Sequence, residues 1–145
     1  MDKNLIKSMK TSLASSFVLY LKTHGFHWNV IGDDFPQLHN LFGDQYEEIW
    51  EAIDDFAEKI RQLESYAPQC MQRFINLSVI DEQPKIITAE AMITELANDN
   101  EKLISQLNDT FAHAERVGDQ ALMDFIAGRL DAHKKHLWML KSTNK

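Results

Sequence analysis

The chain has 145 residues, of which 44% are apolar and 26% charged, with only 5 Gly and 3 Pro. A chain of this size buries roughly two thirds of the surface that it exposes when unfolded, so it needs no disulfide or structural metal in order to fold. Its single cysteine, Cys70, cannot form an internal disulfide, and no CxxC pair offers a thiolate metal site. Residues 1–145 are therefore predicted to form one domain in a reducing compartment, with the cytoplasm as the expected location.

The charge balance is acidic, with 15 Lys and Arg against 22 Asp and Glu, and a formal net charge of -7. A general electrostatic attraction to nucleic acid is therefore disfavoured. The longest unbroken apolar run near the N-terminus covers residues 17–21. It is too short for a signal peptide or a membrane span, so no membrane association is expected.

Apolar residues recur at helical intervals and predict a first helix from about Leu5 to Val30, with Gly32 as its C-terminal stop. Asp33 and Asp34 are candidate N-caps for a second helix, and Pro36 suits its opening turn. This second helix is predicted to run to about residue 63 or 66.

Residues 67–87 form a long connection, in which 71–77 could make one or two helical turns. Thr88 is expected to cap a third helix that ends near Val117 at Gly118, and a fourth runs from about Asp119 to Lys141. The predicted fold class is all-α. It is a four-helix bundle with a short extra helix in the long crossover connection between the second and third helices.

The second helix divides into three sectors when it is drawn at about 100° per residue. An apolar sector is expected to meet the rest of the bundle. A second stripe mixes aromatic, small and polar residues, which predicts a further helix-on-helix contact: His39, Gly43, Tyr46, Trp50, Asp54, Ala57 and Arg61. The third sector is acidic and faces water or cations: Asp44, Glu48, Glu51 and Asp55, with Glu47 and Glu58 at its edge.

Asp54 and Glu58 are four residues apart, so their carboxylates project from one flank of the helix. Such a pair alone is common on solvated helices. His27 and His39 add imidazole ligands, and imidazole with carboxylate suits iron while leaving positions open for an oxidant. His39 and Asp54 are separated by 15 residues on one helix. That spacing is about 22 Å at a rise of about 1.5 Å per residue, so one chain cannot bring both to the same ion.

An antiparallel pair of second helices, with a two-fold axis near Tyr46 to Trp50, would place His39 of one chain opposite Asp54 and Glu58 of the other. This arrangement predicts two symmetric sites between subunits and also buries the mixed stripe. One alternative is that the histidines bind carboxylates across an interface without a metal. Another is a closed structural zinc site without redox chemistry.

The run HGFHWNVIGDDFPQLHNLFGDQY, followed by DDFAEKI, resembles the signature of the Dps proteins, the dodecameric mini-ferritins. The resemblance continues through APQCMQRFINLSVID and HKKHLWML and covers most of the chain. It implies a ferritin-like subunit that assembles as a homo-dodecamer around a hollow interior. It also implies a ferroxidase that oxidises Fe(II) with hydrogen peroxide or dioxygen at intersubunit sites, stores ferric mineral and protects against oxidative stress. The catalytic and metal-binding residues that it implies are His27, His39, Asp54 and Glu58.

One position departs from the family pattern, which usually has Asp or Glu four residues after the second histidine; here that residue is Gly43. Asp44 points about 100° away and is an imperfect substitute. We therefore expect a second iron to bind weakly, with di-iron and mono-iron sites both open. His24 is expected to pack or hydrogen-bond beside the site, and the alternative is that it serves as an additional ligand. The resemblance implies that Trp28 intercepts one-electron oxidants, although an anchoring role in the interface fits equally.

The acidic sector is expected either to line the cage and seed mineral or to form a solvated outer face. The resemblance places Asp119 and Asp124 near three-fold pores, although Asp is also favoured at helix starts. Twelve copies at -7 each carry a formal charge of about -84, so DNA binding is expected to be weak or absent. The few basic residues near the chain ends are Lys3, Lys7, Lys10, Lys141 and Lys145. The competing function is a DNA-binding or structural Dps cage with a degraded metal site.

Overall fold

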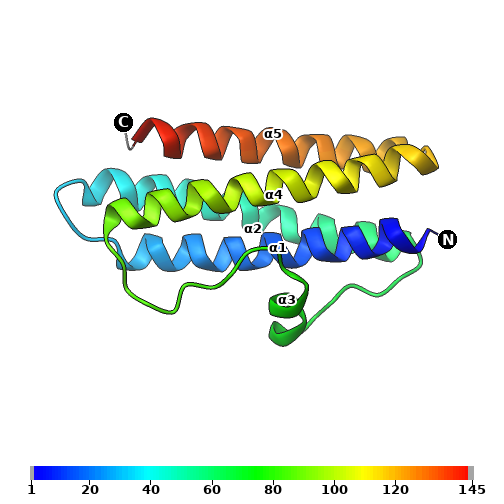
Figure 1. Cartoon of the computed structure of the whole chain (residues 1–145), viewed down its shortest axis with the longest axis horizontal. Coiled ribbons are helices and arrows are strands. Elements are labelled where there is room, and N and C mark those ends of the chain that lie inside the picture. The colour runs from blue at the N-terminus through cyan, green and yellow to red at the C-terminus, as the bar shows by residue number, and fades with distance from the viewer. Residues whose placement is uncertain (1, 144–145) are drawn as a thin grey trace.

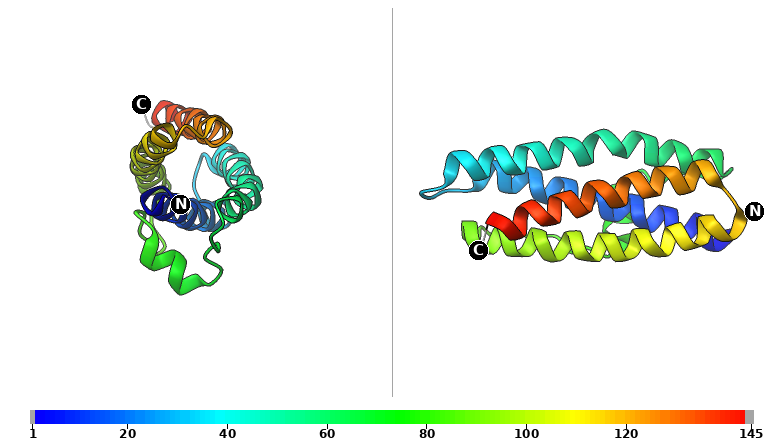
Figure 2. Two further views of the ribbon diagram at one scale, coloured as in Figure 1. Left: turned by 90° about the vertical axis from the view of Figure 1, so that its right-hand side faces the viewer. Right: turned by 90° about the horizontal axis from the view of Figure 1, so that it is seen from above.

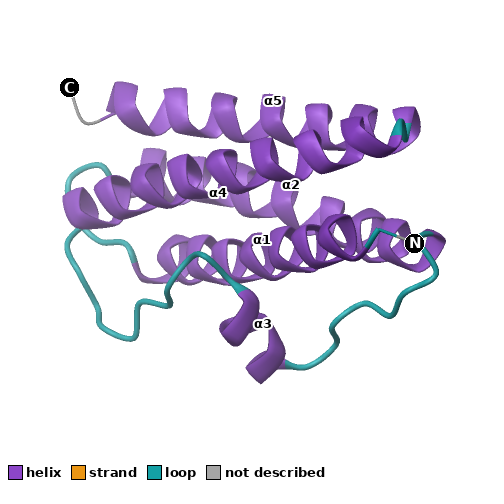
Figure 3. Cartoon of the chain, turned by 45° about the vertical axis from the view of Figure 1, so that its right-hand side comes forward, coloured by secondary structure: helices purple, strands orange, loops and turns teal. Residues whose placement is uncertain are grey.

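The computed structural model describes residues 2–143 and contains five helices in that part of the chain. Four of them are long and lie side by side along the length of the molecule, and the fifth is a short segment in the middle connection (Figure 1). Their bounds are α1 Lys3–Asn29, α2 Phe35–Gln62, α3 Met71–Leu77, α4 Ala89–Val117 and α5 Gln120–Thr143. Outside these helices the described chain is loop and turn (Figure 3). The all-α prediction, with a short extra helix between the second and third long helices, is confirmed.

The four long helices surround one core, and α3 lies outside the bundle (Figure 2). Helix α1 packs against α2, α3 and α4, and α4 packs against α5. The connection between α2 and α4 carries the chain back along the bundle, so α2 and α4 run in the same direction (Figure 1). Stacked rings of Phe17 and Phe74, with centroids 4.5 Å apart, hold α3 on α1. Lys22 Nζ donates to the carbonyl of Asp81 at 2.8 Å and fixes the later part of this crossover.

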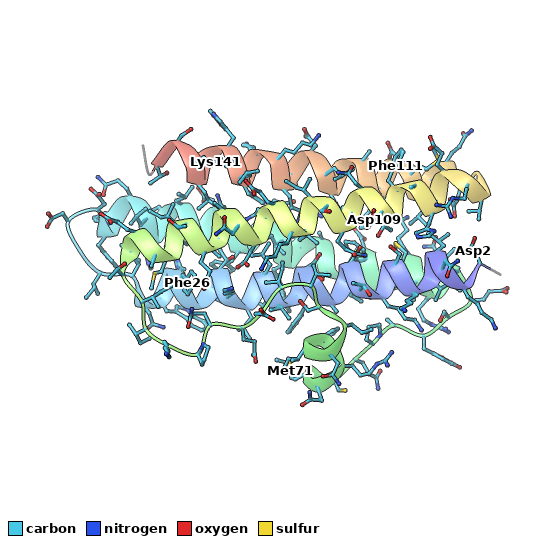
Figure 4. The ribbon with its side chains drawn as sticks, in the orientation of Figure 1. Asp2, Phe26, Met71, Asp109, Phe111 and Lys141 are labelled. Carbon is cyan, nitrogen blue, oxygen red and sulfur yellow. The ribbon has the colours of Figure 1, made fainter. Side chains whose placement is uncertain are left out.

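Local capping explains most helix ends. Asp2, labelled at the start of α1 in Figure 4, accepts a hydrogen bond from Leu5 N at 2.9 Å. The hydroxyl of Thr88 accepts one from Ala91 N at 3.1 Å and caps α4. Gly118 ends α4 at φ 71°, in the left-handed region that glycine adopts without a steric penalty.

The turn between α1 and α2 differs in detail from the prediction. Helix α1 ends at Val30 in an extended conformation, and Gly32, at φ 126°, lies within the following turn. Asp34 occupies the N-cap position of α2 but makes no capping hydrogen bond through its side chain. Pro36 does lie in the first turn of α2, where a missing N–H costs nothing. This tight turn brings the end of α1 beside the start of α2.

The apolar sector predicted for α2 forms part of the core. Its fully buried members are Leu38, Phe42, Ile49, Phe56 and Ile60. The interior also contains polar pairs between helices, because each buried polar group needs a partner. Lys22 Nζ lies 2.7 Å from an Asp99 carboxylate oxygen, and the hydroxyls of Ser8 and Ser12 contact that of Thr110. In residues 2–143, none of the helices has the length and apolar character that crossing a bilayer requires.

Candidate metal centre

Two of the predicted ligands meet at the tight turn. His27 lies in the last turn of α1, and His39 lies near the start of α2. Their rings stack with centroids 3.8 Å apart and an interplanar angle of 17°. The two histidines are therefore in direct ring contact within one chain, and their role as metal ligands stays a prediction.

Each histidine is oriented by the backbone of the other. His27 Nδ1 lies 2.6 Å from the carbonyl oxygen of His39, and His39 Nδ1 lies 2.7 Å from the carbonyl oxygen of His27. A carbonyl only accepts, so both Nδ1 atoms carry the proton and donate. The two Nε2 atoms then keep their lone pairs, which is the tautomer that a metal-binding histidine needs. The arrangement also supplies a donor to the carbonyl of His27, which lies where α1 ends.

Gly43 leaves the space that this arrangement uses. A Cβ built at Gly43 would lie 3.2 Å from both Cε1 and Nδ1 of His27. That separation is shorter than ordinary van der Waals contact, so a side chain at this position would press on the ring that bonds to the carbonyl of His39. With glycine at position 43 the chain lacks the carboxylate of the family pattern, and the ring of His27 can approach α2 closely.

The two predicted carboxylate ligands lie elsewhere on α2. Asp54 and Glu58 are exposed and are at least 15 residues beyond His39 on the same helix. Within residues 2–143, His, Cys, Asp and Glu side chains nowhere gather in threes as a metal-binding group. A single chain thus brings the two histidines together but not the two carboxylates with them, and the four-residue site stays a prediction that requires a second subunit.

Aromatic rings continue from the histidine pair along α1 and α2. His24 stacks face to face on Tyr46, with centroids 3.7 Å apart and an interplanar angle of 8°. The Trp28 ring is tilted by 40° to that of His24, with centroids 4.1 Å apart. The hydroxyl of Tyr20 lies 3.0 Å from His24 Nδ1. Burial and the neighbouring His27 lower the pKa of His24, and burial raises the pKa of Tyr20. In this chain His24 therefore packs and hydrogen-bonds beside the pair.

The mixed stripe of α2 is only partly covered in one chain. Trp50 is 52% exposed, and Trp28 at the end of α1 is 58% exposed. Large exposed aromatics close to polar side chains are typical of surfaces that proteins bury on association. The mixed stripe also contains His39 and Asp54, two of the predicted metal ligands.

Glu48 behaves differently from the rest of the predicted acidic sector. Both of its oxygens bond to Arg129 of α5, and Oε1 also accepts from His136 Nε2 at 2.8 Å. Burial raises the pKa of Glu48, but hydrogen bonds from His136 and Arg129 outweigh this and hold that pKa well below its usual value. The expectation that the whole acidic sector faces water or cations therefore needs correction at Glu48, which is paired with α5, whereas Glu51 and Asp55 are exposed.

Sequence reasoning missed the α5 side of this network. Arg129, His133 and His136 are buried, and no role for them was predicted from the sequence. Their spacing of three and four residues is the only signal that marks one helix face. Asp119, considered as a pore residue, accepts a hydrogen bond from Leu122 N at 3.0 Å and so caps α5. Asp124 is exposed.

Comparisons with known proteins agree with this architecture. A ferritin-like domain family matches residues 6–145. The DNA protection during starvation protein 2 of Bacillus anthracis is 31% identical over 142 residues, which cover 98% of this chain and 97% of that protein. Dps from Staphylococcus aureus has a crystal structure with a TM-score of 0.95 at 30% identity, covering 99% of this chain and 97% of that one.

A Dps protein from Vibrio cholerae O1, described as a member of a broad superfamily of ferritin-like diiron-carboxylate proteins, has a TM-score of 0.92 at 26% identity. The match covers 97% of this chain and 89% of that one. The family match and these relatives place the chain in the Dps family of ferritin-like proteins, as its sequence motifs predicted.

Proposed function

We propose that this chain is a subunit of a mini-ferritin that oxidises Fe(II) with hydrogen peroxide or dioxygen and stores the ferric product in a hollow dodecamer. The oxidation takes place in pockets shared by two subunits. The observation that carries this proposal is the histidine pair, His27 and His39, whose Nδ1 atoms are both engaged so that both Nε2 atoms are free to bind iron. Membership of the Dps family supports the same assembly and chemistry.

In the proposed pocket, one subunit contributes the histidine pair and its partner contributes the carboxylates of Asp54 and Glu58. Neutral imidazoles accept ferrous iron without adding charge, and the anionic oxygens favour the more highly charged ferric ion. The histidines must be unprotonated to bind, so acid should weaken iron loading. Because Gly43 supplies no carboxylate, the second iron of a pair should bind more weakly than the first.

Subunit complementation tests the shared pocket directly. We expect His39→Ala and Asp54→Ala to abolish Fe(II) oxidation when each variant is assembled alone. A mixed dimer contains one pocket with both substitutions and one pocket with neither. Random co-assembly of equal amounts should therefore restore about one quarter of the unaltered activity per subunit.

The controls separate assembly from chemistry. Mixing two preparations of His39→Ala should restore nothing, and Asp55→Asn, at an exposed neighbouring position, should keep full activity. Size-exclusion chromatography should show that each variant still assembles. If the mixed variants remain inactive although each forms the same oligomer, the pocket is not shared in this way. If unaltered protein oxidises iron at the background rate, the competing reading as an inert cage is correct.

A further inference from the structure

A polar cluster lies inside the bundle, where α2, α4 and α5 face one another. It consists of Glu48 from α2, Asn100 from α4, and Arg129, His133 and His136 from α5. The three α5 side chains are deeply buried, and His133 is not exposed at all. Among residues 2–143, no carboxylate other than Glu48 makes a hydrogen bond to this cluster. The cluster is separate from the histidine pair at the turn between α1 and α2.

The interior of the bundle is where proteins of this fold class can hold metal within one chain. Ferritin-like di-iron proteins project a Glu from each of two helices, and a Glu-x-x-His motif from each of the other two, into the bundle. Here His133 and His136 have the same three-residue spacing on α5, but Glu48 is the only carboxylate that joins them. As the protein stands, these side chains do not form a metal-binding group in residues 2–143.

A guanidinium nitrogen occupies the point where the donor atoms of this cluster meet. Arg129 Nη2 donates to Glu48 Oε1 at 3.0 Å and to His133 Nε2 at 3.2 Å. His136 Nε2 lies 2.8 Å from the same Glu48 oxygen. One carboxylate oxygen and two imidazole nitrogens therefore gather around a single positive charge, and that charge belongs to the chain itself.

His133 is already oriented as a metal-binding histidine would be. Its Nδ1 donates to Asn100 Oδ1 at 2.9 Å, and the Asn100 amide is fixed because its Nδ2 donates to the carbonyl of Leu96 at 2.8 Å. The lone pair of His133 Nε2 then points at Arg129, since a guanidinium only donates. Arg129 Nε is buried and has no hydrogen-bond partner within residues 2–143, so the cluster does not satisfy the whole guanidinium.

We propose that Arg129 is a built-in cation that occupies a metal position inside the bundle and excludes divalent metal from it. Without the guanidinium, Glu48, His133 and His136 would hold one divalent transition metal. Two imidazoles and one carboxylate suit Fe(II) and Co(II) and leave coordination positions open. The inference goes beyond the proposed function and holds whether or not two subunits share an iron pocket.

Charge explains why the metal and the guanidinium exclude each other. Arg129 and Glu48 together are neutral, so a dication beside them would leave two uncompensated positive charges in a buried cluster. Nη2 also takes the space in which a metal would contact both Glu48 Oε1 and His133 Nε2. Iron that this chain binds is therefore kept out of the bundle interior and must bind elsewhere on the subunit.

Co(II) binding to Arg129→Ala tests the proposal without any measurement of iron oxidation. Every protein carries His39→Ala, so that the proposed intersubunit pocket does not contribute. Calorimetric titration of the assembled protein should show one additional Co(II) per subunit in Arg129→Ala, bound at least 100-fold more tightly than any at this position when Arg129 is present. The visible absorption bands of the bound Co(II) should indicate nitrogen and oxygen ligands. Circular dichroism and size-exclusion chromatography check folding and assembly, and Arg129→Gln replaces Arg129→Ala if the latter does not fold.

Two controls assign the additional metal. Combining Arg129→Ala with His133→Gln should weaken it at least tenfold, because one imidazole ligand is lost. Arg129→Lys keeps a positive charge and should bind it at least tenfold more weakly than Arg129→Ala. The proposal is overturned if folded Arg129→Ala or Arg129→Gln gains no Co(II), or if the gain is unaffected by His133→Gln. It is also overturned if protein that retains Arg129 binds a Co(II) that His133→Gln removes, because the triad would then be open to metal.

Discussion

Glu48 of α2 and Arg129 of α5 form a two-pronged ion pair across the bundle. Arg129 Nη1 donates to Oε2 at 2.5 Å and Nη2 donates to Oε1 at 3.0 Å. The Arg129 side chain is only 8% exposed, whereas that of Glu48 is 38% exposed. The guanidinium is thus the more deeply buried partner, and the carboxylate of Glu48 offsets the cost of removing its charge from water.

Removing that carboxylate should destabilise the bundle. In Glu48→Ala, Arg129 stays buried without its counter-charge, and we expect the free energy of unfolding to fall by about 2–4 kcal/mol, less than for a fully buried pair. Glu51→Ala, an exposed acidic neighbour on the same helix, should change it by about 0.5 kcal/mol or less. Urea denaturation at one fixed protein concentration compares the three proteins. Equal losses in both variants would contradict a special role for the Glu48 pair.

The lowered pKa of the buried His133 leads to a prediction of how the free energy of unfolding depends on pH. Its Nδ1 donates to Asn100 Oδ1 at 2.9 Å, Arg129 Nη2 donates to its Nε2 at 3.2 Å, and burial together with Arg129 lowers its pKa well below 6.5. His133 therefore stays neutral in the folded protein at pH values just below 6.5, where the same side chain in the unfolded chain binds a proton. Stability should therefore be complete above that pH and fall below it, by at most about 1.4 kcal/mol per pH unit from this group.

His133→Gln removes this titration while keeping a donor and an acceptor. Denaturation curves from pH 7 to pH 5 should be flatter for this variant than for the unaltered protein. His113→Gln, at a half-buried position on α4, is the matched control for the substitution itself. Below pH 4.5 the depressed pKa of Glu48 adds a second loss, because its carboxylate stays ionised in the folded state after the unfolded chain has bound a proton. A slope that is the same in all three proteins would exclude His133 as its source.

The fold was predictable because its signals are local. The caps at Thr88 and Gly118 and the apolar sector of α2 depend on residues within a turn or two of each other. A helical wheel could not identify the partner of Glu48, because the angle around α2 says nothing about which α5 side chain lies opposite. Pattern reasoning found His27 and His39 but not their reciprocal hydrogen bonds, which depend on how the turn at residues 30–34 places two helices.

DNA binding should be weak or absent at physiological salt. The net charge of -7 per chain repels phosphate, and the exposed lysines at the start of α1, Lys3 and Lys7, form a small patch. Gel shifts with linear duplex DNA should show no complex at about 0.15 M salt, with any complex at low salt lost as salt rises. Lys3→Gln combined with Lys7→Gln should remove such a low-salt complex. A tight complex that survives the higher salt would contradict this expectation.

Gly43→Ala isolates the contact between position 43 and His27. The added methyl group would lie 3.2 Å from Cε1 and Nδ1 of His27, so the ring must shift by a few tenths of an ångström, which disturbs its hydrogen bond to the carbonyl of His39. Loss of an orienting hydrogen bond behind a metal-binding histidine typically costs about 10- to 100-fold in affinity, and we expect a loss near the lower end for Co(II) as an optical probe. The helix itself should be stabilised by about 0.5–1 kcal/mol, because alanine is the better helix former.

Gly128→Ala is the matched control, because nothing lies within 4 Å of a Cβ at that position in α5. It should gain similar helix stability and bind Co(II) like the unaltered protein. Gly43→Asp carries the same Cβ but adds a carboxylate, so it should weaken the first metal and raise the number of metals bound per pocket at saturation. Calorimetric titration with Co(II) measures both quantities. Unchanged affinity in Gly43→Ala would show that His27 tolerates a side chain there, and the geometric reason given for the glycine would then be wrong.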